Sequence, residues 1–159
     1  MITISATPVG FAPDEITTSE STRFARLKWV VIVDNTLPAG RQVNAAVCVA
    51  AATSVLVSGL LGPDGQDADG VDHPGLPWAG CSILGASAEQ MSTIREKATD
   101  AAGVHVTDMP AAAQETRVYD EYLEQLSQTP VGGLRPFAIS LVGPRKDVDK
   151  LVKKLSLLP

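Results

Sequence analysis

Apolar runs and amphipathic stretches alternate along the chain, and this alternation predicts four strands and four helices. The apolar runs predict strands over 27–33, 78–84, 104–107 and 134–142. A long segment of small residues and three amphipathic stretches predict helices over about 41–61, 87–101, 115–128 and 144–155. Strands that alternate with helices favour parallel neighbours joined by right-handed crossovers. We therefore expect an α/β fold, a three-layer α/β/α sandwich with a four-stranded, mostly parallel (mixed) sheet.

Local signals predict where several elements end. Ser87 and Gln90 have the spacing of a capping box, which predicts a helix start, and Gly103 stands where a left-handed C-terminal cap belongs. Met109-Pro110 is expected to break the third strand. Residues 62–77 are rich in Gly, Pro and Asp and predict a long loop.

One domain is expected behind an N-terminal arm. The first 23 residues are rich in Thr, Ser, Pro and Glu and show only fragments of a strand pattern, so 1–23 is predicted to be a partly ordered arm. Residues 24–159 are predicted to form a single α/β domain. A length of 159 residues with 45% apolar positions is typical of one compact domain.

Segment 42–61 carries no charge and is about as long as a membrane-spanning helix. Its polar residues, among them Asn44 and Thr53, and its many alanines make it less apolar than such a helix, and no Lys/Arg cluster or aromatic belt flanks it. We interpret it as a long helix buried inside a soluble protein, and expect no membrane association.

The charge balance argues against one class of partner, although a local basic patch would be compatible with it. The chain has 13 Lys and Arg against 18 Asp and Glu, a net charge of -5. General nucleic-acid binders neutralise phosphates with Lys and Arg, so general nucleic-acid binding is not expected.

The two cysteines, Cys48 and Cys81, form no paired spacing with each other or with the histidines, so no disulfide framework and no metal site is indicated. The N-terminus lacks the basic start and apolar run of a signal peptide, which favours a cytoplasmic setting. The dinucleotide-binding, phosphate-loop and serine-hydrolase motifs do not occur in the sequence, so no cofactor is expected.

Candidate binding residues gather where strands are predicted to end, because open α/β sheets bind ligands outside the carboxyl ends of their strands. Asp34 follows the first strand and Asp108 the third. Arg41, Asn44 and Cys48 are spaced i, i+3 and i+7, so they share one helical face near the first strand's end. An Arg and an Asn on one stripe suit a carboxylate or phosphate ester. A pairing of Arg41 with Asp108 would favour this site.

A plainer interpretation stays open for the same residues, in which Asn44 bonds a neighbouring loop, Cys48 packs as an inert thiol, and Arg41 is solvated. His73 lies among aspartates in the 62–77 loop and is a candidate ligand-binding residue of a lid, or simply part of a solvated loop. His105, inside the third strand, is expected to be structural.

Two segments carry a resemblance to a known family. The strand ending in Asp, the segment LPAGRQVNAAVCVAAATSVLVSGLLG and the ending SLVGPRKDVDKLVKKLSLLP resemble the bacterial family catalogued as domain of unknown function number 2000. The likeness covers roughly 24–159. That family is similar in fold to the type II peptidyl-tRNA hydrolases, so the resemblance implies their fold.

The match to the hydrolase site is incomplete. Gly40-Arg41 resembles the hydrolases' Gly-Lys pair and Asp108 their strand-end Asp, but Ala45 or a neighbour stands in place of the Gln and Cys48 in place of the His. Met109-Pro110 replaces their Ala-Gly. Losing the Gln and His removes groups that would orient or deprotonate water. Arg41 stays protonated and is expected to bind an anion rather than act as a base.

Three functions therefore stay open. The first is binding of a small anionic or acyl ligand in a crevice at the strand ends, either as a binding protein or as a diverged hydrolase or transferase with Asp108 and Cys48 as candidate catalytic residues. The second is a non-enzymatic homodimeric interaction module. The third is a residual peptidyl-tRNA hydrolase.

Overall fold

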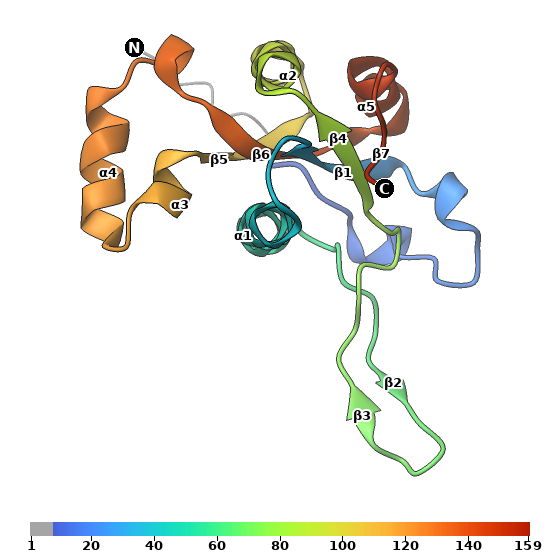
Figure 1. Ribbon diagram of the computed structural model, residues 1–159. Coiled ribbons are helices and arrows are strands. Elements are labelled where there is room, and N and C mark those ends of the chain that lie inside the picture. Colours follow the sequence, from blue (N-terminus) through green and yellow to red (C-terminus); the bar gives the residue numbers. More distant parts are fainter. Residues whose placement is uncertain (1–7) are drawn as a thin grey trace, which may run out of the picture.

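The structure is a computed structural model that describes residues 8–159, and a five-stranded sheet forms its centre (Figure 1). The strand order is β5-β6-β1-β4-β7. The strands are β1 (Leu27–Asp34), β4 (Ser82–Ala86), β5 (His105–Pro110), β6 (Pro136–Pro144) and β7 (Ser156–Leu157).

The sheet differs from the predicted one in strand number and direction. Only β1 and β4 pair in parallel, whereas β6 is antiparallel to both β1 and β5, and β7 is antiparallel to β4. The predicted α/β class and mixed sheet are confirmed, but the prediction of four strands, most of them parallel, is wrong. The physical reason is that the segment between β5 and β6 lies beyond the sheet's edge instead of crossing one of its faces, so β6 returns beside β5 in the opposite direction (Figure 1).

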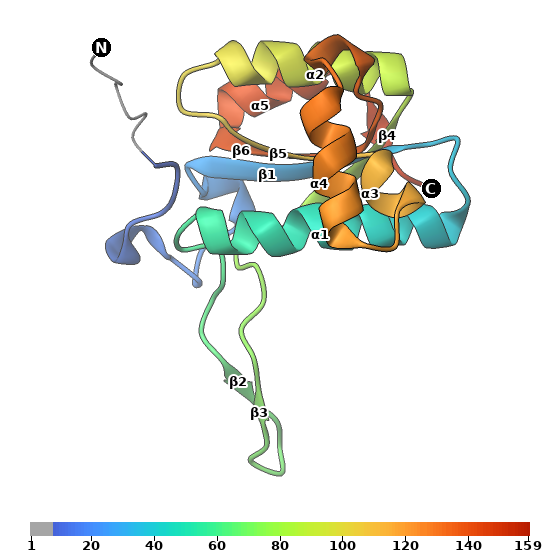
Figure 2. The same ribbon diagram turned by 90° about the vertical axis from the view of Figure 1, so that its left-hand side faces the viewer.

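Helices cover both faces of the sheet. Helix α1 (Ala39–Leu56) covers one face, and α2 (Ala88–Asp100) and α5 (Arg145–Val152) cover the other (Figure 2). Helices α3 (Ala112–Glu115) and α4 (Tyr119–Gln128) lie beyond the β5 edge. Short 3-10 turns occur at Pro13–Glu15, Thr22–Phe24 and Val131–Gly133.

Strand β1 is the centre of two apolar cores, because its β-branched residues are buried on both faces. Val31 and Val33 belong to the core beneath α1, and Val30 and Ile32 to the core beneath α2 and α5. The capping box predicted at Ser87 is confirmed: the Ser87 side chain accepts from the Gln90 N–H and the Gln90 side chain accepts from the Ser87 N–H.

Helix α1 is buried along one stripe only. Ala45, Val49 and Thr53 are its buried residues, and its outer side is exposed. The expectation that this helix is buried inside the protein is therefore wrong, because no second layer from residues 8–159 covers its outer side. Within residues 8–159, no helix is long and apolar enough to cross a membrane.

Two further element predictions need correction. The helix predicted over 115–128 is split, because residue Thr116 is extended and separates α3 from α4. The strand predicted over 78–84 begins only at Ser82, while Trp78 instead packs against Phe11 with ring centroids 4.9 Å apart. The third strand continues through Met109-Pro110, where the pairing with β6 changes register.

Residues 62–77 form an ordered arm rather than an irregular loop. Its strands β2 (Gly65–Gln66) and β3 (Asp72–His73) pair as a hairpin that projects away from the domain on the α1 side (Figures 1 and 2). At its base the N–H of Gly62 donates to the Leu76 carbonyl at 2.8 Å. A side chain at Gly75 would clash with the Gly62 backbone, so only glycine permits this close approach.

Part of the predicted N-terminal arm belongs to the folded domain. Phe11 is buried in the core beneath α1, and its N–H donates to the Ser58 carbonyl at 2.9 Å. Arg26 binds Glu15 through Nε at 2.6 Å and ties the segment to the start of β1. The arm's first seven residues lie outside the described part of the chain.

Candidate functional site

A pocket of about 460 Å³ lies between α1, the edge strand β5 and the segment that contains α3 and α4. This volume is within the usual range for small-molecule pockets, roughly 300–1,000 Å³. Its lining residues come from α1 (Asn44, Cys48, Val49, Ala52), from β5 (Thr107, Asp108, Met109) and from the α3–α4 segment (Ala113, Thr116, Arg117, Val118, Tyr119, Tyr122).

The α1 wall presents the helical stripe that the sequence predicts. Asn44 and Cys48 lie one turn apart, and the Cys48 thiol is 4.0 Å from Oδ1 of Asn44. Both residues are exposed and both line the pocket. The second cysteine, Cys81, is not in this pocket; the residue as a whole is exposed, but partial desolvation of its thiol raises its pKa to about 12.

The β5 wall contains Asp108, which pairs with Arg95 and not with Arg41 as the sequence analysis considered. Oδ2 of Asp108 accepts a hydrogen bond from Nε of Arg95 on α2 at 2.7 Å, so Arg41 does not pair with it. Met109 packs into the core beneath α1, whereas Asp108 reaches α2 on the other side of the sheet. Because β5 is an edge strand, Asp108 still borders the pocket.

The outer wall is aromatic and basic. Tyr119 and Tyr122 stand edge to face, with ring centroids 5.5 Å apart. Burial raises the pKa of the Tyr122 hydroxyl, and the nearby Tyr119 and the negative charge of Asp108 raise it further, so Tyr122 is a hydrogen-bond donor at neutral pH. Arg117 is exposed and supplies a positive charge at the pocket lining.

Gln114 of α3 fixes this wall to α1, and sequence reasoning missed it. Its Nε2 donates to the Arg41 carbonyl at 2.9 Å and to Oδ1 of Asn44 at 3.0 Å. Its Oε1 is buried and has no hydrogen-bond partner in the described part of the chain. The sequence offered no sign of this role, because Gln114 lies in a predicted loop and its two partners are 70 and 73 residues away along the chain.

Asp34 is a buried carboxylate at the carboxyl end of β1, outside the pocket lining. The hydroxyl and N–H of Thr36 both donate to its Oδ1, and Arg135 donates to Oδ2 at 2.9 Å. Burial alone would raise the pKa of Asp34, but the bonds from Thr36 and the charge of Arg135 outweigh burial and lower it. Asp34 thus holds the end of β1 to the start of β6.

The two other candidate residues also lie away from the pocket. Arg41 is exposed in the first turn of α1 and contributes its carbonyl to the Gln114 contact. His73 lies on the projecting arm, where its Nε2 is 3.2 Å from Oδ2 of Asp67. The structure therefore brings together Asn44, Cys48 and Asp108, and not Arg41, Asp34 or His73.

Neither of the chain's two histidines lines the pocket. His105, at the start of β5, has Nε2 2.7 Å from the hydroxyl of Thr107, and burial lowers its pKa. Over residues 8–159, no group of three His, Cys, Asp or Glu side chains is arranged to hold a metal ion.

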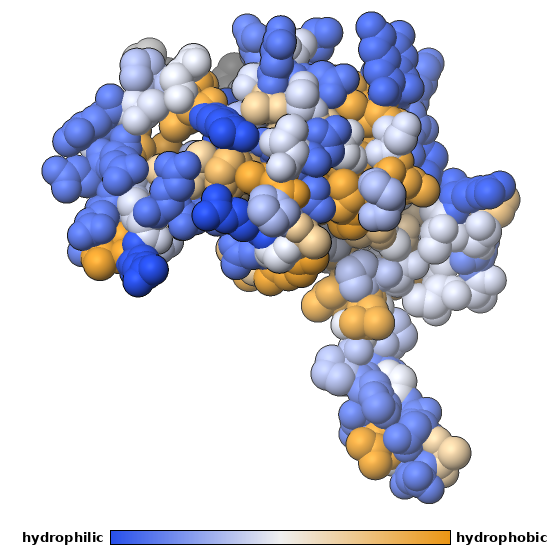
Figure 3. All heavy atoms as spheres, in the orientation of Figure 1, coloured by the Kyte–Doolittle hydropathy of each residue, from blue (hydrophilic) through white to orange (hydrophobic). Residues whose placement is uncertain are grey.

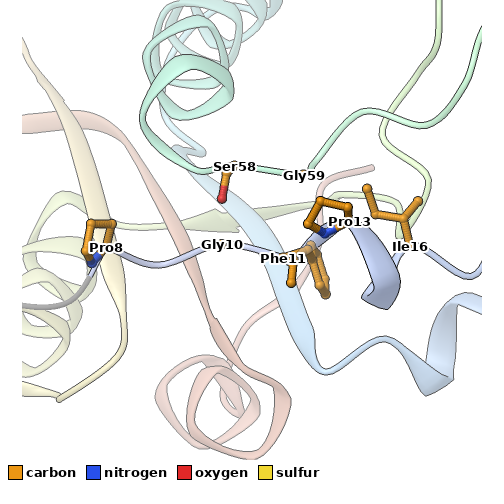
Figure 4. Close-up of a pocket in the computed structure, with 8 residues that line it drawn as sticks. Pro8, Gly10, Phe11, Pro13, Ile16, Ser58 and Gly59 are labelled. Atoms are coloured by element: carbon orange, nitrogen blue, oxygen red, sulfur yellow. The ribbon is translucent and has the colours of Figure 1, made fainter.

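A second hollow, of about 420 Å³, lies where the N-terminal segment crosses the end of α1 (Figure 4). Figure 4 shows Ser58 and Gly59 beside Gly10 and Phe11 at this crossing. A side chain at Gly10 would collide with Ser58, so glycine is required at this crossing. Its lining contains no charged side chain, which leaves the pocket at α1, β5 and α4 as the better candidate site.

Comparisons with known proteins identify the family. The model of the family described as "Protein of unknown function (DUF2000)" matches residues 27–159. The chain belongs to the DUF2000 family. The family resemblance expected from the sequence is thereby confirmed, and all three walls of the pocket lie within the DUF2000 match.

The DUF2000 fold also occurs in a solved structure. That structure, of a protein of unknown function from Agrobacterium tumefaciens strain C58, has a TM-score of 0.78 and 16% sequence identity to this chain. The likeness covers 84% of this chain and 98% of that one, and at this identity it shows the fold alone. The comparison with curated proteins gives no match. The similarity to type II peptidyl-tRNA hydrolases stays a prediction.

Proposed function

We propose that the pocket between α1, β5 and α4 binds a small molecule with an apolar acyl or aromatic body and an anionic group. The proposal rests on one observation: polar and aromatic side chains from three elements line the same pocket. They are Asn44 and Cys48 of α1, Asp108 of β5, and Tyr119 and Tyr122 of α4. Small-molecule sites typically combine apolar and aromatic walls with a few polar groups that orient the ligand.

The lining assigns a role to each part of such a ligand. Val49, Met109 and the ring of Tyr122 offer apolar contact to an acyl chain or aromatic ring. Arg117 offers a guanidinium that binds a carboxylate through two parallel hydrogen bonds. The anion is thus expected at Arg117 rather than at Arg41, which lies outside the lining.

Binding is proposed in preference to hydrolysis because the pocket lacks an imidazole. His105 and His73 are the chain's two histidines, and neither lines it. Asp108 is the carboxylate at the pocket, and one of its oxygens is occupied by Arg95. Cys48 has an amide oxygen rather than a base beside it. A general base must lie within hydrogen-bond reach of the proton it removes.

The first experiment titrates 4-phenylbutanoate into the ¹⁵N-labelled protein, with 4-phenylbutanol as the uncharged matched probe. We expect chemical-shift changes concentrated in residues 44–52 and 107–122, and weaker binding of the alcohol. Arg117→Gln should weaken binding of the acid about tenfold, which corresponds to the loss of one charge-assisted contact. Arg23→Gln, an exposed arginine outside the pocket, is the matched control. Chemical-shift changes scattered over the surface would overturn the proposal. So would an equal loss of affinity for the acid in Arg117→Gln and Arg23→Gln.

A second experiment separates binding from residual catalysis. The purified protein is incubated with an N-acetylated aminoacyl-tRNA, beside Asp108→Asn and Arg41→Ala, and release of the acyl group is measured. We expect no release above buffer. Release that both variants abolish would show that a peptidyl-tRNA hydrolase site is retained, and would replace the binding proposal.

A further inference from the structure

The outer face of α1 is an apolar stripe that nothing in the described chain covers. Val43, Val47 and Val55 are 62%, 60% and 84% exposed, and with Ala51 they recur every four residues along one side of the helix. The only charged residue of α1 is Arg41. Figure 3 shows hydrophobic atoms on the underside of the body, where Figure 1 places α1. Large contiguous apolar patches mark protein contacts, and the absence of charge along this stripe makes α1 a candidate contact surface.

The β2–β3 arm is a second element without support from its own domain. Residues 63–74 are all exposed. Internal hydrogen bonds nevertheless order the arm: Oδ1 of Asp67 accepts from the N–H groups of Asp69 and Val71, and Oδ1 of Asp64 accepts from that of Gly75. An isolated two-stranded hairpin is marginally stable in water, so a surface against which the exposed arm could pack would stabilise it further.

We propose that two copies of the chain pair through the α1 stripe with their α1 helices antiparallel, each arm lying against the N-terminal end of the partner's α1. The arm leaves the domain beyond the C-terminal end of α1, on the same side of the sheet as the stripe (Figure 2). A twofold axis brings the same surface of both copies together. In the antiparallel arrangement, the C-terminal end of one α1 and its arm come beside the N-terminal end of the other.

Charge favours this arrangement over a parallel one. The arm carries four aspartates, at 64, 67, 69 and 72, and no Lys or Arg. The N-terminal end of α1 carries Arg41 and the partial positive charge of the helix dipole, and Gln114 ties the segment with Arg117 to this end. A parallel pairing would instead set the two acidic arms beside each other.

The size of the surfaces requires the arm as well as the stripe. Helix α1 is about 27 Å long and roughly 10 Å wide, so its face covers about 270 Å² in projection. A stable interface buries roughly 800 Å² on each partner. The arm, with eight residues on each side of its tip, is about 26 Å long, and its exposed Val71 and Leu76 add apolar contact.

The test measures the mass in solution by light scattering after size-exclusion chromatography over a range of protein concentrations. We expect twice the chain mass of 16.6 kDa, falling to one chain mass in Val47→Asp. Ser92→Asp places the same charge on the exposed side of α2 and should stay dimeric. Circular dichroism melting checks that each variant folds. A wild-type mass of one chain at every concentration, or a dimer that Val47→Asp leaves intact, would overturn the proposal.

A charge exchange tests the arm separately. Arg41→Glu and Asp69→Arg should each weaken the dimer about tenfold, as close interfacial charges do, and the double variant should recover most of the loss. Asp69 is suitable because its carboxylate accepts no hydrogen bond from residues 8–159. Replacing residues 65–72 with Asn-Gly, a tight hairpin turn, should also weaken the dimer. Single variants without effect, or a double variant no better than either, would overturn the arm contact. None of these readouts depends on the pocket binding a ligand.

Discussion

Arg95 of α2 donates from Nε to Oδ2 of Asp108 at 2.7 Å, and so connects one helical layer to the strand that borders the pocket. The two side chains are 29% and 25% exposed, which places the pair between a surface contact and a buried one. The carboxylate at the candidate site is thus oriented from the opposite face of the sheet.

Breaking this pair should cost a modest amount of stability. In a double-mutant cycle of Arg95→Met and Asp108→Asn, we expect each single change to lower the free energy of unfolding by about 1 kcal/mol. The coupling energy should be about 0.5–1 kcal/mol, because most of each loss is the same interaction. Urea unfolding at neutral pH gives these values. Fully additive losses would mean that the contact contributes nothing in solution.

Asp34 is expected to make stability depend on pH. Its folded pKa is lowered, so it contributes stability that is fully present above its unfolded pKa of about 3.9 and is lost as pH falls through the lower folded value. Asp34→Asn should therefore destabilise the protein by about 1–3 kcal/mol at pH 7, and by less below about pH 4. Urea unfolding of both proteins at pH 7 and pH 3 checks this. A difference that is the same at both values would contradict the lowered pKa.

A chain of buried hydroxyls joins α1 to the sheet. Nε1 of Trp29 donates to Oγ of Ser140, which lies 2.8 Å from the hydroxyl of Thr53, and that hydroxyl donates to the Val49 carbonyl. The Thr53 hydroxyl has a single proton, which it donates to Val49, so the Ser140 hydroxyl is the donor in the hydrogen bond between Ser140 and Thr53. All three side chains are buried.

Ser140→Ala should cost about 1–3 kcal/mol, because it leaves the Trp29 N–H buried without an acceptor. Thr53→Val should cost less, since Trp29 keeps Ser140 and the replacement has nearly the same volume. Equilibrium unfolding in urea, followed by circular dichroism, compares the two. The decisive result is which variant loses more free energy of unfolding. If Thr53→Val lost more than Ser140→Ala, Ser140 would not be the residue that holds the network together.

The parts of the site that were predictable from the sequence are those set by local rules. Helical spacing places Asn44 and Cys48 on one stripe. Asp108 differs, because the sequence predicts it just past the end of the third strand, whereas it lies within β5 and borders the pocket because β5 is an edge strand. The capping box at Ser87 is equally local. Asn44, Cys48 and the capping box occur where the sequence predicts them because nothing beyond a few neighbours decides their positions.

The parts that were not predictable depend on contacts distant in sequence. Arg95 rather than Arg41 pairs with Asp108 because α2, which the pattern alone could not place, packs beside β5. Apolar runs carry no information on strand direction, so the sequence pattern could not show that β6 lies antiparallel between β5 and β1. The arm at 62–77 was predicted as a loop because its order comes from side-chain bonds of Asp64 and Asp67 to backbone groups.

The last prediction concerns the segment that precedes the DUF2000 match. Phe11 is 4% exposed, packs on Trp78, and lies 16 residues before the matched region begins at Leu27. Truncating a buried Phe to Ala typically costs 3–5 kcal/mol, so Phe11→Ala should lower the urea midpoint strongly, and a chain that starts at residue 27 should lose at least as much. Because the Nε1 of Trp78 donates to the Gly59 carbonyl under Phe11, the tryptophan emission should also shift to the red. Arg23→Gln, on the exposed part of the same segment, is the control and should change neither quantity. A shortened chain as stable as the full one would show that residues 8–26 dock without contributing to the fold.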